Sequence, residues 1–344
     1  MDKHDILNFT PEEFKEKMRE IKELPYRAAQ VFSWIYKKGV RDFIAMENIP
    51  APLKDKLSAL YCIGNVSLAH SVRSSDDSEK FLFKLYDANY IESVLIPAKD
   101  RRTLCLSTQV GCKYNCLFCA SGSQGFKRNL SAGEIISQIL FIQEKFKDKI
   151  TNFVFMGMGE PFDNYENFKK AVKIMNDKDA LNIASRRITV STSGVIPAIE
   201  DFKKLGLQVN LSVSLHAAND KLRSALMPIN KKYPLEKLIK VCEDFFETTK
   251  RKITLEYILI RGVNDSLKDA GDLAKIARRL KAKVNLIAYS SICRGDLAAP
   301  ERQVIDTFIK ALMRYRVNVI LRESKGKDIQ AACGQLALMH SENH

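Results

Sequence analysis

The sequence has no long apolar run and no sign of an export signal. None of its 344 residues falls in a stretch approaching the roughly 18 uninterrupted apolar residues of a membrane span. The N-terminus lacks both the apolar core and the small-residue cleavage site of a secretory signal peptide. We therefore predict a cytoplasmic protein with no membrane contact.

Acidic residues are also scarce relative to basic ones. The chain has 41 Asp and Glu against 55 Lys and Arg, which gives a net charge of +14. Residues 1–60 hold eleven basic and ten acidic residues, so nearly all of the excess lies in the rest of the chain. Any single basic pair is better explained as solvated surface. Together they predict a polyanionic partner, because phosphate contacts provide most nonspecific affinity for nucleic acids.

Cysteine is infrequent, and its placement matters more than its number. The length excludes a disulfide-stapled miniprotein, and cytoplasmic thiols stay free for metal binding or catalysis. Three of the eight cysteines are scattered singly and are expected to be small buried side chains: Cys62, Cys242 and Cys293. The other five are the candidate functional residues: Cys105, Cys112, Cys116, Cys119 and Cys333.

Residues 1–60 predict a small helical accessory domain. Thr10 to Glu13 reads as a capping box with Pro at the first helical position, and the helix should end near Lys22. A second helix is expected from Tyr26 to Lys38, before a terminating Gly39.

The rest of the chain predicts an α/β core. Short alternating runs in residues 61–103 indicate a small antiparallel β extension. Strands and helices then alternate through residues 104–336, which predicts a parallel sheet curled into a full or partial barrel. Residues 337–344 form a C-terminal tail. Without repeats, low-complexity segments or long linkers, these parts should form one compact body.

Polar motifs follow three of the predicted strands directly. GMGEP follows TNFVFM, STSG follows RITV, and SLHA follows VNLSV. Turn chemistry explains part of this pattern. Since the carboxyl ends of parallel strands carry the working residues of such folds, we also expect a functional site there.

The spacing Cys112-x3-Cys116-x2-Cys119 indicates a metal centre. One interpretation is a zinc site, for which Cys105 is a candidate fourth ligand. The other is a [4Fe-4S] cluster, whose three protein ligands leave one iron open. The amino and carboxylate groups of S-adenosylmethionine (SAM) can chelate that iron.

This loop, with Phe118 before its last cysteine, resembles the radical SAM superfamily. From roughly Tyr26 to Leu336 the chain is similar to the RlmN family of adenine-C2 RNA methyltransferases and their Cfr relatives, which methylate adenine C8. The matching stretches include LPYRAAQVFSWIY, TLCLSTQVGCKYNCLFCASG, FMGMGEP, RRITVSTSGVIP, LMPINKKYPLEKLI and DIQAACGQL. The resemblance implies a partial (β/α)6-type radical SAM barrel with a cluster on Cys112, Cys116 and Cys119.

The resemblance also implies a mechanism. Adenine C2 lies between two ring nitrogens and is too electron-poor for polar methyl transfer. Cys333 would accept a methyl group from one SAM, and a 5′-deoxyadenosyl radical from a second SAM would activate that methyl for addition to the base. Cys105 would resolve the covalent RNA adduct by forming a disulfide. Glu92 matches the proton acceptor, and the alternative is a surface strand glutamate without a catalytic role.

The cofactor contacts follow from the same resemblance. Gly159 and Glu160 match the segment that receives the amino group of SAM, and Ser191 matches a ribose contact. The next strand end supplies Ser214, Leu215 and His216. Ser290 replaces the Asn that family members usually carry, and a hydroxyl cannot reproduce an amide's donor and acceptor pair.

The implied partners are 23S rRNA, tRNA and an electron donor such as flavodoxin or ferredoxin, and we expect a monomer. The target is an adenine of the peptidyl-transferase centre, and in tRNA the adenine 3′ of the anticodon. Two alternatives stay open. One is a Cfr-like adenine-C8 methyltransferase, and the other is a non-catalytic zinc-dependent RNA-binding protein, which leaves Cys333 and GMGEP unexplained.

Overall fold

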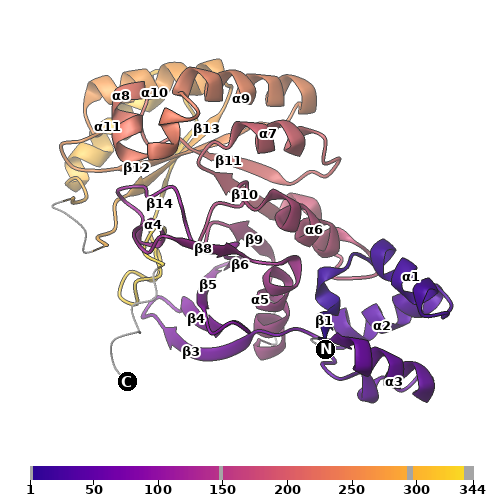
Figure 1. Cartoon of the computed structure of the whole chain (residues 1–344). Coiled ribbons are helices and arrows are strands. Elements are labelled where there is room, and N and C mark those ends of the chain that lie inside the picture. Colours follow the sequence, from indigo (N-terminus) through magenta and orange to yellow (C-terminus); the bar gives the residue numbers. More distant parts are fainter. Residues whose placement is uncertain (1–2, 147–149, 293–296, 337–344) are drawn as a thin grey trace.

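A ten-stranded mixed sheet organises the computed structural model (Figure 1). The structure describes residues 3–146, 150–292 and 297–336, so the expected tail and Cys293 lie outside it. The strand order is β14-β13-β12-β11-β10-β9-β6-β5-β4-β3. No helix among the described residues is long and apolar enough to cross a membrane.

The N-terminal residues form the predicted helical module. Its elements are β1 (His4–Asp5), α1 (Pro11–Glu20), α2 (Tyr26–Tyr36), α3 (Ala51–Leu60) and β2 (Tyr61–Cys62). The capping box is confirmed, because Thr10 and Glu13 each accept a hydrogen bond from the other's backbone N–H. Gly39, at φ +70°, follows the end of α2 as expected. Figure 1 shows these helices grouped beside α5 and α6, where Glu13 forms an ion pair with Lys170.

The antiparallel strands continue the core sheet. They are β3 (Ser67–Arg73), β4 (Glu79–Lys84) and β5 (Tyr90–Ala98), and β5 pairs antiparallel with β6 (Arg101–Cys105). The β extension expected in residues 61–103 is therefore the edge of a larger sheet. The domain boundaries on either side of it remain a proposal.

The parallel part of the sheet runs from β6 to β14. Its further strands are β9 (Asn152–Phe155), β10 (Ile188–Thr192), β11 (Asn210–Ser214), β12 (Thr254–Leu259), β13 (Lys283–Ala288) and β14 (Val319–Arg322). With β6 these make seven parallel strands among the described residues, so β14 extends the six-strand repeat by one. The predicted α/β partial barrel is confirmed.

Helices cover the outer face of this curved sheet, as Figure 1 shows for α6, α7, α9 and α10. The long helices of the core are α5 (Ala132–Lys145), α6 (Tyr165–Asn176), α7 (Ile196–Lys203), α9 (Leu235–Thr249), α10 (Leu267–Arg279) and α11 (Arg302–Arg314). The shorter elements are β7 (Gln109–Gly111), α4 (Ala120–Ser123), β8 (Phe126–Asn129) and α8 (Asp220–Leu226). The antiparallel β7–β8 pair frames the cysteine loop and was not expected from the sequence.

Candidate active site

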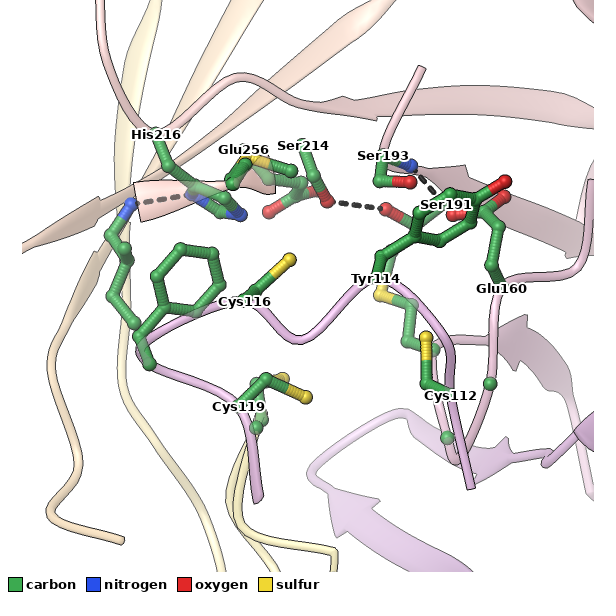
Figure 2. Close-up of a pocket in the computed structure, with 18 of the residues that line it drawn as sticks. Cys112, Tyr114, Cys116, Cys119, Glu160, Ser191, Ser193, Ser214, His216 and Glu256 are labelled. Atoms are coloured by element: carbon green, nitrogen blue, oxygen red, sulfur yellow. Dashed lines mark hydrogen bonds between the residues drawn. The ribbon is translucent and has the colours of Figure 1, made fainter. Parts of the chain in front are cut away.

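The carboxyl ends of the parallel strands surround a pocket (Figure 2). The pocket encloses about 890 Å³ of empty space, including the solvent at its mouth. Its polar lining comes mainly from the motifs that the sequence places after β9, β10 and β11. The expectation that these strand ends meet at one site is confirmed.

The three cysteines of the C-x3-C-x2-C loop line this pocket. Cys116 is buried, and Cys112 and Cys119 are half-buried. Figure 2 shows the three sulfur atoms facing a common space. Burial raises the pKa of Cys112 to about 12 and that of Cys116 well above its ordinary value.

This donor set fits an iron-sulfur cluster. Three thiols around one cavity are the ligands such a cluster requires, and a bound cation would hold them as thiolates despite their burial. Within the described residues, no three His, Cys, Asp or Glu side chains lie close enough to bind a single metal ion. The three thiols line one pocket together, as the ligands of a multi-atom cluster do.

The segment after β9 forms one wall of the pocket. Gly159 has φ +95°, and a Cβ there would lie 2.4 Å from the Cβ of Gln109, so no other residue fits without displacement. Glu160 is buried and accepts hydrogen bonds from the backbone N–H groups of Phe162 (2.9 Å) and Ser193 (2.7 Å). Burial raises the pKa of Glu160, and these two donors oppose that shift.

The ends of β10 and β11 form the adjoining wall. The hydroxyls of Ser191 and Ser214 lie 3.3 Å apart and both line the pocket. His216 packs edge-on against Phe118, with ring centroids 4.6 Å apart, and its Nδ1 accepts the N–H of Ile258. Burial lowers the pKa of His216 to about 3, so this ring is neutral.

Leu215 lies behind this wall, because it is buried and does not line the pocket. Its N–H donates to the carbonyl of Glu256 at 3.0 Å. Its place in the structure is therefore that of a backbone support for the strand end.

A second cavity joins the first at Cys333. It holds about 1260 Å³ of empty space, including solvent, and Cys105 lines it together with the ends of β5, β6 and β14. Cys333 lines both cavities, and it is accessible because it faces them. Both thiols are free. Burial raises the pKa of Cys105 to about 12, and desolvation by the cavity walls raises the pKa of the accessible Cys333, while Arg322 opposes both shifts.

Two charged residues of the site were missed by the sequence interpretation. Glu256 and Arg322 line the first pocket, with Glu256 Oε2 3.7 Å from Arg322 Nη1. Arg322 is the last residue of β14, so the expectation that functional residues lie at the carboxyl ends of the strands would have found it. Glu256 was visible as a lone acidic residue within the apolar run ITLEYILI.

Besides Leu215, two more predicted site residues border neither cavity. Glu92 is fully buried on β5, where its carboxylate lies 3.1 Å from the ammonium group of Lys80. Ser290 is buried after β13, and its hydroxyl has no hydrogen-bond partner among the described residues. The roles assigned to these two residues therefore remain predictions.

The comparisons with known proteins agree with this geometry. Residues 106–274 match the radical SAM superfamily, and residues 4–63 match the ribosomal RNA large subunit methyltransferase N-terminal domain. A radical SAM methyltransferase of Sphaerobacter thermophilus is similar in structure, with a TM-score of 0.93 and 39% identity, over 97% of this chain and 99% of that one.

Two relatives match over nearly their full lengths. A protein of Clostridium novyi (strain NT), named probable dual-specificity RNA methyltransferase RlmN, is 42% identical over 99% of both chains. The dual-specificity RNA methyltransferase RlmN of Geotalea uraniireducens (strain Rf4) is 42% identical over 98% of this chain and 97% of its own.

The partial barrel, the three-cysteine loop and the pocket at the strand ends define a radical SAM enzyme, a class that uses a [4Fe-4S] cluster and SAM. The non-catalytic zinc-dependent alternative is thereby overturned. Within this class, the chain belongs to the RlmN family of dual-specificity RNA methyltransferases.

Proposed function

We propose that this enzyme methylates C2 of adenine in two RNAs. The targets are the peptidyl-transferase-centre adenine of 23S rRNA and the adenine 3′ of the anticodon in tRNA. Cys333 carries the methyl group to the base, and Cys105 releases the product. An external reductant such as a flavodoxin or ferredoxin supplies the electron.

The observation that supports this proposal most directly is the place of Cys333 between the two cavities. On one side lie the cysteines suited to a cluster, and on the other lies Cys105. A thiol at this junction faces the first pocket, which is proposed to hold the cofactors, and the second cavity, which is proposed to hold the substrate. It can therefore serve both without moving between separate sites.

Residues of the first pocket hold the cofactors in this proposal. Cys112, Cys116 and Cys119 bind the cluster, and Glu160 binds the amino group of SAM. When bound, the cluster and SAM supply a methyl group and a hydrogen-abstracting radical. Ser191 and Ser214 present hydroxyls to the same pocket and are proposed to orient the rest of SAM.

The second cavity receives the adenine in this proposal. Ile96, Pro97 and Ile320 give it apolar walls on which a flipped-out base can pack, and Arg101 and Lys325 add positive charge to its lining. Cys333 then links to the base as an RNA–protein adduct. The Cys105 thiolate attacks the sulfur of Cys333, so that a disulfide forms and the bond between that sulfur and the carbon attached to C2 breaks. That carbon takes up a proton to become the methyl group, C2 loses its original hydrogen as a proton, and the methylated RNA is free.

An anaerobic assay with defined 23S rRNA fragments and tRNAs tests the proposal. Cys105→Ala should accumulate a covalent RNA adduct, because the resolving thiol is missing. Cys333→Ala should abolish both methylation and adduct. Cys62→Ala, which removes a thiol outside the site, is the matched control and should behave as the wild type.

Nucleoside mass spectrometry reads the product. The proposal expects 2-methyladenosine, and 8-methyladenosine as the sole product would instead indicate the Cfr-like activity. Turnover that survives in Cys333→Ala would contradict the covalent scheme.

A further inference from the structure

Arg223 is a fully buried cation whose partners are all neutral. Its guanidinium donates hydrogen bonds to the carbonyl groups of Ser193 (2.7 Å), Ser214 (3.1 Å) and Leu215 (3.2 Å), and to the side-chain oxygen of Asn230 (2.8 Å). No acidic side chain in the described part of the chain forms an ion pair with it. A buried charge without a counter-charge is costly, so its presence needs a physical reason.

The helix that carries Arg223 contacts the cysteine loop directly. Arg223 lies on α8, and the carbonyl of Leu226, at the end of this helix, accepts the N–H of Leu117 at 3.0 Å. Leu117 lies between Cys116 and Cys119. The carboxylate of Asp220 reaches Arg223 only through Asn230, whose amide donates to Asp220 Oδ1 at 3.0 Å. The thiolate set of the loop is a further anionic partner that the site offers.

The hydrogen bonds of Arg223 also connect two walls of the pocket. Ser193 follows β10, and Ser214 ends β11, and both line the cavity. One guanidinium thus fixes the carbonyl groups at two neighbouring strand ends, and the helix that carries it is hydrogen-bonded to the cysteine loop.

We infer that Arg223 is the buried counter-charge of the cysteine loop. Its positive charge favours reduction of the bound cluster, and its hydrogen bonds position the ends of β10 and β11 beside the cluster. This inference rests on the proposed function, because it requires the cluster. Arg223 is a positioning residue and touches no reacting atom. Since reduction adds negative charge, loss of a nearby cation makes the cluster harder to reduce.

The test is a redox titration of the reconstituted full-length enzyme, followed by electron paramagnetic resonance. Arg223→Gln removes the charge, and Arg223→Lys keeps it. Lys221→Gln, an exposed position on the same helix, is the matched control for loss of one charge. At a fixed ambient potential, Arg223→Gln should lower the ratio of reduced to oxidised cluster about tenfold, which is roughly 59 mV for one electron.

Arg223→Lys should stay within about twofold of the wild type, and Lys221→Gln should not change, because solvent screens its charge. Wild-type potential in Arg223→Gln would overturn the inference and leave Arg223 a purely structural anchor. Failure of the wild type to assemble any cluster would overturn the proposed function as well, so the two failures are distinguishable.

A second measurement covers the case in which Arg223→Gln assembles no cluster. Arg223→Ala is reconstituted with added guanidinium ion or with urea, which has a similar shape but no charge. Restored cluster assembly with guanidinium alone supports the inference. Equal restoration by urea, or no restoration by either, overturns it.

Discussion

A buried ion pair links the antiparallel strands to the loop that carries Cys333. Lys80 on β4 and Glu92 on β5 lie 3.1 Å apart, and their side chains are only 7% and 1% exposed. The ammonium group of Lys80 also donates to the carbonyl of Gln330 at 3.5 Å, three residues before Cys333. The pair therefore supports the position of the Cys333 thiol.

Replacement of Lys80 by Met should destabilise the protein by about 3–5 kcal/mol, because it removes the ammonium group that lies 3.1 Å from the buried carboxylate of Glu92. The free energy of unfolding in urea measures this loss. In the double variant Lys80→Met/Glu92→Leu the loss should be smaller, since no charge remains buried. A loss below about 1 kcal/mol for Lys80→Met, the value of a surface pair, would show that the pair is solvated in solution.

At the scale of elements, the turn between β3 and β4 is hydrogen-bonded to the loop that follows β14. We call these hydrogen bonds, made by Asp328 and Asp76, the clasp. Asp328 accepts hydrogen bonds from the hydroxyl of Ser74 (2.5 Å) and the N–H of Ser75 (2.9 Å). In the opposite direction, Asp76 accepts the N–H of Gly326 at 2.9 Å. Two segments about 250 residues apart in sequence thus hold each other, and this clasp keeps the Cys333 loop against the cavities.

The clasp should persist to low pH. The hydrogen bond from Ser74, followed by that from Ser75, lowers the pKa of Asp328 from 3.8 to about 2. Because the pKa of Asp328 is lower in the folded protein, its charged form stabilises the fold fully at any pH above the ordinary value of 3.8. This stabilisation is lost as the pH falls from there toward 2. Amide hydrogen exchange in residues 72–78 and 324–330, corrected for intrinsic rates, should therefore be unchanged between pH 7 and pH 5.

Asp328→Asn should exchange faster in both segments at either pH, because a neutral amide is a weaker acceptor. Asp306→Asn, an exposed carboxylate on α11, is the control and should leave both segments unchanged. Equal protection in Asp328→Asn would mean that the charge of Asp328 does not hold the clasp.

At the scale of the whole molecule, the positive charge is concentrated outside the N-terminal helices. Part of it lies in the second cavity, where Arg101 comes from the start of β6 and Lys325 from the loop after β14. These two strands are the ends of the parallel part of the sheet, so the cations flank the opening between them. RNA that delivers a base there would bring its phosphates close to both.

The double variant Arg101→Gln/Lys325→Gln should weaken RNA binding and its salt dependence. Each lost phosphate contact should reduce the slope of log affinity against log salt by roughly 0.7–0.9. Binding measured at several salt concentrations checks this. Lys237→Gln/Lys268→Gln removes the same charge from the exposed faces of α9 and α10 and should change the slope less. Equal slopes in the two double variants would contradict the proposal that RNA phosphates bind at this cavity.

The sequence by itself determined the features that depend on neighbours along the chain. The capping box at Thr10 and the termination of α2 near Gly39 follow from local backbone chemistry. The spacing of the three loop cysteines predicted a metal centre, and the polar motifs after β9, β10 and β11 predicted the edge of the sheet at which the site lies. These patterns are periodic or contiguous, so they can be recognised without knowing the fold.

Only the tertiary structure decided which distant residues share a cavity. It brought Cys333 between the cluster loop and Cys105, added Glu256 and Arg322 to the site, and left Glu92 paired with Lys80 outside both cavities. It also gave Arg223 its buried place behind the strand ends. Such contacts depend on the curvature and closure of the sheet, which bring segments far apart in the chain together, and no local spacing encodes them.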